Sequence, residues 1–344
     1  MKSRLLAFAA LTGVVLVGIR LTRADASSVN RAPAASPRAD TPAVVIGSPG
    51  PTRVTMRNVD FHQAEGVLLR IAALDGEMRS VKRGVVDFDD KTSYVLMIDT
   101  GTVTLGTADL TNLMNRYVFA YPGAPLRNLK VSLRGSSLGL TGILRKGVDI
   151  PFDLTSDVTL TSDEKMRLHP TKIKIFGVNG AVLMKALGIN LQKMLDLSKA
   201  KGVIVQGNDL VLSPLVVLPP PTIRGRIVAV RVTPVGLEQV FGWARGATRE
   251  EPPAPADSTA RNYMLYRGGT LHFGKLYMTD AELLVVDLDP ATPFDFDNDH
   301  YQRQLIAGRS RTLPSLGLEV YMPDAGRLGE RSVASTSRSA TSPR

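Results

Sequence analysis

The best match to a catalytic motif is Gly135-Ser-Ser-Leu-Gly139, which fits the G-x-S-x-G pattern of a nucleophilic serine. That pattern requires a strand before the serine and a helix after it, so that the turn exposes the hydroxyl group. Here the alternating run Leu129–Leu133 comes first, and Leu138 and Leu140 continue in a strand pattern afterwards. We therefore predict a hairpin turn at this position and no nucleophile at Ser137.

Three acids, Asp295, Asp297 and Asp299, resemble the first half of a calcium-binding loop. Such a loop needs Gly at its sixth position and Glu at its twelfth, where this chain has His300 and Ile306. We favour a turn followed by a short helix, whose N-terminal dipole attracts acids. Weak calcium binding is kept as the alternative, and no metal ligand is assigned.

The four histidines, His62, His169, His272 and His300, are scattered and have no metal-ligand spacing. The sequence also lacks cysteine and contains no P-loop, G-x-G-x-x-G or H-E-x-x-H motif. These absences remove thiolate catalysis and the common nucleotide and zinc motifs. We predict that the protein is not an enzyme and has no cofactor.

The formal net charge of +10 is concentrated at the two ends of the chain. Residues 1–53 hold seven basic and two acidic side chains, and residues 325–344 hold four basic and one acidic. Because the body between them is nearly neutral, a phosphate-binding groove is not indicated and we expect no nucleic-acid partner. The basic ends favour weak attraction to an anionic membrane surface.

The N-terminal residues have the features of an export signal. Met1–Arg4 is basic, Leu5–Ile19 is apolar and uncharged, and Ala24-Asp-Ala26 fits a small-x-small cleavage site. The alternative is an uncleaved anchor in the inner membrane, because Arg20 and Arg23 precede the cleavage site, although the apolar run is shorter than the roughly 20 residues of a spanning helix. Both interpretations place the body in the periplasm or another extracytoplasmic space.

Strand patterns fill most of the chain, in about a dozen short alternating runs joined by short turns. Gly207-Asn-Asp209, between Val203–Gln206 and Leu210–Leu212, is a strong hairpin signal. Short helices are expected over 108–118 and around Tyr301. The predicted organisation is a signal peptide or anchor (1–26), a flexible linker (27–53), a curved-sheet domain (54–244), an exposed loop (245–260), a C-terminal hairpin and helix extension (261–324) and a disordered tail (325–344).

One long helical pattern runs from Gly180 to Leu197, with an apolar stripe wider than a surface helix needs. We therefore predict an α+β fold: a mostly antiparallel, strongly curved β-sheet wrapped around one long apolar helix, with a smaller C-terminal β-rich extension. The stripe is formed by Val182, Leu183, Leu187, Leu191, Met194 and Leu195, and Lys185 and Lys193 lie on its polar edge.

Three segments, Leu105–Asn115, Leu129–Leu133 and Val203–Ser213, carry a family resemblance. Over residues 94–241 the chain resembles bacterial envelope proteins of the tubular lipid-binding (TULIP-like) type, including the LmeA-like phospholipid-binding proteins. This resemblance implies a long curved sheet wrapped on helices, with an elongated apolar cavity for lipid tails. Residues 261–323 lie outside it, and the single helix departs from the duplicated form of the larger members.

These observations predict an exported envelope protein that binds or carries lipid in an apolar groove between sheet and helix, with a phospholipid or other acyl-chain ligand as its partner. The six residues of the stripe would line the groove, and Lys185 and Lys193 would face the headgroup. The alternative is a non-catalytic structural or adaptor protein, because leucines at helical spacing usually form an ordinary closed core. Such an adaptor would use a partner surface, for which 261–323 is the candidate.

Overall fold

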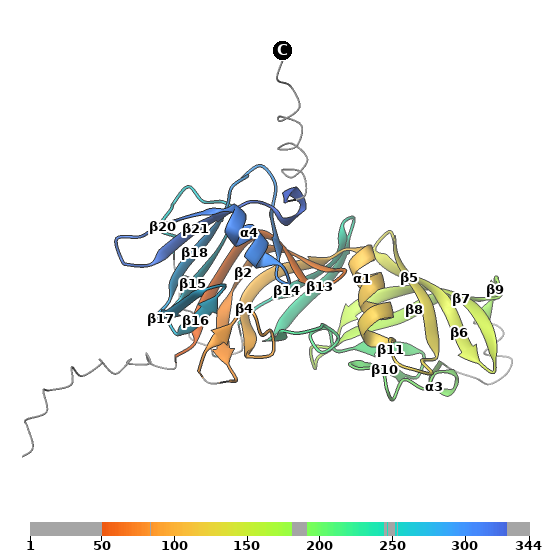
Figure 1. Ribbon diagram of the computed structural model, residues 1–344. Coiled ribbons are helices and arrows are strands. Elements are labelled where there is room, and N and C mark those ends of the chain that lie inside the picture. Colours follow the sequence, from red (N-terminus) through yellow and green to blue (C-terminus); the bar gives the residue numbers. More distant parts are fainter. Residues whose placement is uncertain are drawn as a thin grey trace, which may run out of the picture. The chain divides into compact units, whose positions relative to one another are not determined.

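Long antiparallel strands dominate the computed structural model (Figure 1). Among the residues that the structure describes, strands account for 54% and helices for 10%. The structure describes residues 50–82, 84–180, 191–243, 246, 252 and 254–328. These residues belong to one compact unit. The protein is therefore mostly β.

The first sheet has eleven strands in the order β13-β14-β4-β2-β1-β15-β18-β21-β20, with β12 parallel to β4 and β19 parallel to β1. The first sheet contains residues from both sides of the loop expected over 245–260, because β1 pairs with β15. Its strands are β1 (Thr52–Ala64), β2 (Val67–Ser80), β4 (Tyr94–Leu105), β12 (Thr222–Gly225), β13 (Ile227–Thr233), β14 (Gly236–Phe241), β15 (Tyr263–Arg267), β18 (Glu282–Asp287), β19 (Phe294–Asp297), β20 (Arg309–Thr312) and β21 (Leu318–Met322).

The second sheet has the order β10-β11-β8-β7-β6-β5, with β9 added beside β8. Its strands are β5 (Leu126–Arg134), β6 (Ser137–Lys146), β7 (Val148–Leu160), β8 (Met166–Ile175), β9 (Val178–Asn179), β10 (Val203–Gln206) and β11 (Asp209–Leu212). A small third sheet joins β3 (Val86–Asp87), β16 (Thr270–Phe273) and β17 (Leu276–Thr279).

The helices of the described part are short. They are α1 (Thr107–Leu113), which continues as the π-helical η1 (Met114–Val118), α3 (Leu191–Met194), α4 (Tyr301–Ala307) and the 3-10 helix η2 (Ala325–Arg327). None of the helices that the structure describes is long and apolar enough to cross a membrane.

The predicted α+β fold, with its sheet wrapped around one long apolar helix, is wrong. Where that helix was expected to run to Leu197, α3 ends at Met194, and across the described residues no long apolar helix is present. The physical reason is that strands, and not a long helix, bury the apolar side chains of the described residues. The apolar residues of the strands pack on one another, and the main hydrophobic cluster takes most of its members from the strands of the first and second sheets.

Glycine and bulges allow the first sheet to curl. A Cβ atom at Gly76 in β2 would collide with the backbone carbonyl oxygen of Met97 in β4, so only glycine permits this close approach of the two strands. The β2–β4 register also shifts between Asp75 and Gly76. Bulges bend a strand and increase its local twist, which gives the sheet a concave apolar face.

Candidate functional site

The concave face of the first sheet encloses a narrow apolar pocket. Its wall includes Met56 and Phe61 of β1, Leu74 of β2, Val103 of β4 and Phe241 of β14, and its volume is about 40 Å³. A cavity that holds one benzene molecule has a volume of about 150 Å³, so this first pocket is too small for an acyl chain as it stands. Its lining is nearly all apolar, which favours hydrocarbon over a polar ligand.

Two buried glutamines are the main polar residues in the wall of the first pocket. Gln63 is fully buried, and its Nε2 donates to the Pro219 carbonyl oxygen at 2.5 Å. Its Oε1 atom accepts no hydrogen bond, and the same holds for Oε1 of Gln239. A buried acceptor without a donor costs free energy, of order 1–3 kcal/mol. A ligand hydroxyl or protonated carboxyl group could supply the missing donor.

A second pocket, of about 70 Å³, lies between α1 and the second sheet. Leu110 of α1, Val131 of β5 and Leu168 of β8 contribute to its wall, together with Leu237 of β14. Leu237 pairs with Leu105, which lines the first pocket. The first and second pockets are therefore neighbours across one pair of leucines.

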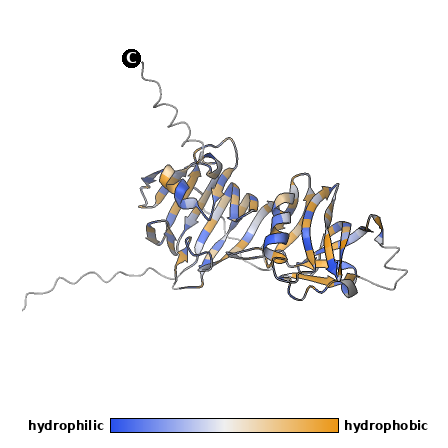
Figure 2. Cartoon of the chain, turned by 45° about the vertical axis from the view of Figure 1, so that its right-hand side comes forward, coloured by the Kyte–Doolittle hydropathy of each residue, from blue (hydrophilic) through white to orange (hydrophobic). Residues whose placement is uncertain are grey.

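A third pocket, of about 30 Å³, continues along the second sheet. It shares Leu126, Leu140 and Leu210 with the second pocket, so these three leucines separate the two spaces. Apolar residues recur along the strands that form this region (Figure 2). The three pockets together make a row of small apolar spaces through the interior.

The structure describes only part of the predicted lipid groove. Leu191 and Leu195 are buried and line the third pocket, which brings them together with Phe152 and Ile175 of the second sheet. Val182, Leu183, Lys185 and Leu187 lie outside the described residues, and the side chains of Lys193 and Met194 do as well. The placement of the headgroup lysines therefore stays a prediction.

Sequence reasoning missed the strand residues that form most of the pocket walls. Their signal was present, because Leu138 and Leu140 were recognised as one apolar face of a hairpin, and both line the second pocket. Gln63 was missed entirely. Its position two residues after Phe61 places both side chains on one face of β1.

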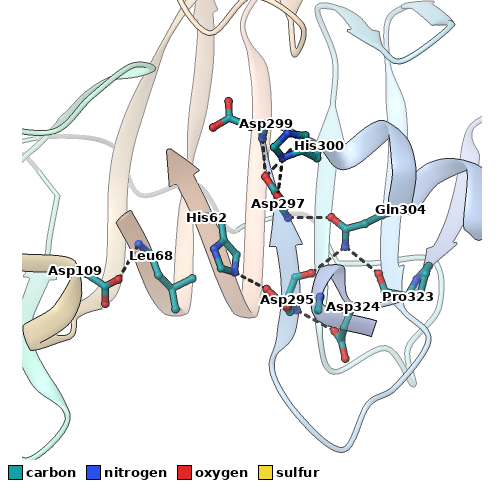
Figure 3. Close-up of polar contacts among 11 residues, drawn as sticks. His62, Leu68, Asp109, Asp295, Asp297, Asp299, His300, Gln304, Pro323 and Asp324 are labelled. Carbon is teal, nitrogen blue, oxygen red and sulfur yellow. Dashed lines mark hydrogen bonds and ion pairs between the residues drawn. The ribbon is translucent and has the colours of Figure 1, made fainter. Parts of the chain in front are cut away.

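A polar network ties β1 to the C-terminal segment (Figure 3). Nε2 of His62 lies 2.6 Å from Oδ1 of Asp295, and this hydrogen bond raises the pKa of His62. Burial works to raise the pKa of Asp295, but the hydrogen bonds from His62 and from the Gly326 amide hold it below its usual value. The Asp295 amide in turn donates to Asp324. These hydrogen bonds hold β1 against the C-terminal segment, and the group contains no nucleophile.

The acids considered for calcium are already engaged by protein donors. Asp297 accepts the backbone amides of Asp299 and His300, which is a turn before α4 (Figure 3). Among the described residues, Asp87, Asp89 and His272 could together offer ligand atoms to a metal ion.

The donors around this second group are protein atoms as well. His272 Nδ1 lies 2.9 Å from Oδ1 of Asp87, and the Tyr301 hydroxyl donates to Asp89. Such hydrogen bonds are sufficient to explain why the three side chains meet.

Ser137 begins β6 directly after a two-residue turn, as predicted, with Gly135 at a φ of +64°. Its hydroxyl donates to Asp157 at 2.6 Å. No helix follows it, so the geometry of a nucleophile elbow is missing.

No known protein family, curated protein or solved structure matches this chain significantly. The resemblance to tubular lipid-binding proteins therefore stays a prediction.

Proposed function

We propose that this chain binds the acyl chain of a lipid in the row of apolar pockets between its strands. The observation that carries the proposal is the lining of the three pockets, which is almost wholly apolar and continuous through shared or paired leucines. Burying a methylene group contributes about 0.8 kcal/mol. Several methylene groups in such a space would give useful affinity without any catalytic residue.

Binding requires the pocket walls to move apart, because each space is well below the roughly 150 Å³ of a cavity that holds one benzene molecule. Methionine supports such adaptation, since its unbranched side chain refills irregular spaces at low cost. Met56 and Met78 line the first pocket, and Met114 and Met166 line the second. The proposed site is therefore one that opens around its ligand.

The polar end of the ligand would lie at Gln63 and Gln239. Both offer a buried side-chain oxygen that has no donor. This favours an amphiphile whose hydroxyl or protonated carboxyl group can donate, over a pure hydrocarbon. The exported location expected from the sequence belongs to the same proposal. Of the expected ligands, a phospholipid or another acyl-chain compound, the two glutamines favour the second, because an ionised phosphodiester has no proton to donate.

The test is binding of a fluorescent long-chain fatty acid to the purified chain and to two matched variants. Leu140→Trp adds bulk at the wall between the second and third pockets. Ile143→Trp makes the same kind of change on the opposite face of β6, outside the lining of all three pockets.

We expect Leu140→Trp to weaken binding at least tenfold and Ile143→Trp to leave it unchanged, with thermal melts showing that both variants fold. Equal binding by all three folded proteins would place the fatty acid elsewhere. Absence of binding to the unmodified chain would overturn the proposal.

The small pocket volumes favour one second candidate, a non-catalytic structural or adaptor protein with a closed core. In that case the apolar residues serve only to stabilise the fold, and function lies on a partner surface. The same fatty-acid titration separates the two, since a closed core gives no saturable binding.

A further inference from the structure

One end of the second sheet carries three exposed apolar side chains on two adjacent turns. Val148 follows the β6–β7 turn and is 64% exposed, while Phe176 and Val178 flank the β8–β9 turn and are 63% and 58% exposed. Exposing three large apolar groups in one place is unfavourable in water, and such groups mark interaction surfaces. We call Val148, Phe176 and Val178 the apolar tip.

The strand pairing places these two turns at the same end of the sheet. Phe152 of β7 pairs with Ile175 of β8, and the Phe176 amide donates to the Pro151 carbonyl oxygen at 3.1 Å. The β8–β9 turn therefore begins beside Pro151, three residues along β7 from Val148. Figure 1 shows β6, β7 and β9 meeting at this end.

The apolar tip continues the lining of the third pocket. Val148 shares a face of β7 with Ile150 and Phe152, because alternate residues of a strand point to the same side. Val178 pairs with Ile175 and so shares its face. Ile150, Phe152 and Ile175 all line the third pocket, so an apolar surface runs from the pocket to the tip.

Basic side chains surround the apolar tip. Arg145 and Lys146 precede the β6–β7 turn, and Lys172 and Lys174 precede the β8–β9 turn; all four are exposed. The acid nearest to Val148 in the sequence, Asp149, pairs with Arg127. Apolar groups with a basic rim are the chemistry that suits an anionic lipid surface, where the apolar groups insert and the cations meet phosphates.

Another exposed apolar side chain lies in a turn of the first sheet. Val235, which is 65% exposed, lies in the β13–β14 turn between Pro234 and Gly236. It supplies a matched control for Val178, because it has the same residue type and a similar exposure.

We propose that the apolar tip docks on the surface of an anionic phospholipid bilayer. Phe176 and Val178 would insert among the lipid chains, with the basic rim at the phosphate level. The further step, passage of an acyl chain from the bilayer into the third pocket, rests on the proposed function. Docking itself does not depend on it.

The test uses the full chain labelled at one site with an environment-sensitive dye, which the absence of native cysteine makes specific. Val178→Cys carries the dye at the tip and Val235→Cys carries it at the control turn. The label reports insertion locally, so binding through the N-terminal segment alone does not change it.

Vesicles of phosphatidylglycerol with phosphatidylcholine should shift the tip dye to shorter wavelength and raise its emission. Vesicles of phosphatidylcholine alone should shift it much less, high salt should reduce the effect, and the dye at Val235→Cys should not respond. Adding Phe176→Asp to Val178→Cys should weaken the response at least tenfold. An unresponsive tip dye, or a response that survives Phe176→Asp, would overturn the proposal.

Fatty-acid binding in solution, measured on the Phe176→Asp variant, separates the two proposals. Normal fatty-acid binding with lost docking would support both. Docking by a chain that binds no fatty acid would leave the tip proposal standing and overturn the proposed function. Fatty-acid binding by a chain whose tip does not dock would overturn the tip proposal and leave the proposed function standing.

Discussion

The His62 imidazole joins β1 to β19 through a 2.6 Å contact between its Nε2 atom and Oδ1 of Asp295. The two strands pair in parallel, with Phe61 opposite Phe296, and those two rings stack at a centroid distance of 5.6 Å. A polar contact and an aromatic contact thus support the same strand pairing between distant parts of the sequence. This pairing holds residues 294–297 beside the first strand of the fold.

Replacing His62 with Gln should lower stability most at mildly acidic pH. Asp295 raises the pKa of His62 in the folded state, so the stabilisation is fully present below the unfolded pKa of about 6.5 and is lost as pH rises through the folded value. Because both side chains are partly exposed, we expect less than about 1 kcal/mol. Thermal melts across this range measure the effect.

His169→Gln is the control for this prediction, since His169 makes a similar pair with Asp209 and is itself more exposed than His62. A difference between wild type and His62→Gln that grew toward alkaline pH would contradict the assigned direction.

Replacing Asp287 with Asn should stabilise the protein near neutral pH. Burial raises the pKa of Asp287 to about 6. For an acid whose folded pKa is raised, protonation favours folding below the unfolded pKa, and this advantage is lost as pH rises through the folded value. Keeping the carboxylate charged at pH 7 thus costs up to roughly 3 kcal/mol.

The Asp287→Asn variant should therefore melt higher than wild type at pH 7 and similarly at pH 4. Part of the gain will be lost if the Asp289 amide, which donates to Asp287, finds a weaker acceptor. If the variant melted below wild type by the same amount at pH 7 and at pH 4, the loss of hydrogen bonds to Asp287 would outweigh the removal of its buried charge.

Gly76→Ala should destabilise the fold severely, by more than about 2 kcal/mol, because the added Cβ meets the Met97 backbone and cannot be accommodated by a side-chain rotation. Gly50→Ala is the matched control, since no atom lies within 4 Å of the position its Cβ would take. Chemical denaturation measures both. Equal stability of the two variants would mean that the β2–β4 approach tolerates a methyl group.

Leu210→Ala should lower stability by about 2–5 kcal/mol, because it removes a buried side chain from the wall between the second and third pockets. Ile204→Ala on the neighbouring β10 is the control, since Ile204 is 52% exposed. If the pockets bind acyl chains, a fatty acid should raise the melting temperature of Leu210→Ala more than that of wild type. Equal shifts would argue that Leu210 does not border the ligand.

Local signals in the sequence predicted several elements correctly. The Gly207-Asn208 turn forms the predicted hairpin, with Gln206 opposite Asp209. The helix expected over 108–118 is present as α1 and η1, and the short helix around Tyr301 is α4. These elements are decided by nearby residues such as turn glycines, so a single sequence contains the needed information.

Long-range pairing could not be predicted in the same way. Nothing in β1 indicates that β15 and β19 will flank it, because strand pairing depends on which apolar faces meet after the chain has turned many times. The fold predicted around one long helix was wrong for a related reason, although residues 181–190 of that helix lie outside the described part of the chain. Leu191 and Leu195 are buried, as expected, but burial at that spacing also suits a short helical turn covered by strands.

Acyl-chain binding is tested most directly by native mass spectrometry, combined with lipid extraction, of the protein purified from the cells that produce it naturally. We expect a near-stoichiometric lipid that co-purifies with the chain and is reduced in Leu140→Trp relative to Ile143→Trp. A mass equal to that of the bare chain, with no extractable lipid, would contradict acyl-chain binding and favour the closed-core adaptor.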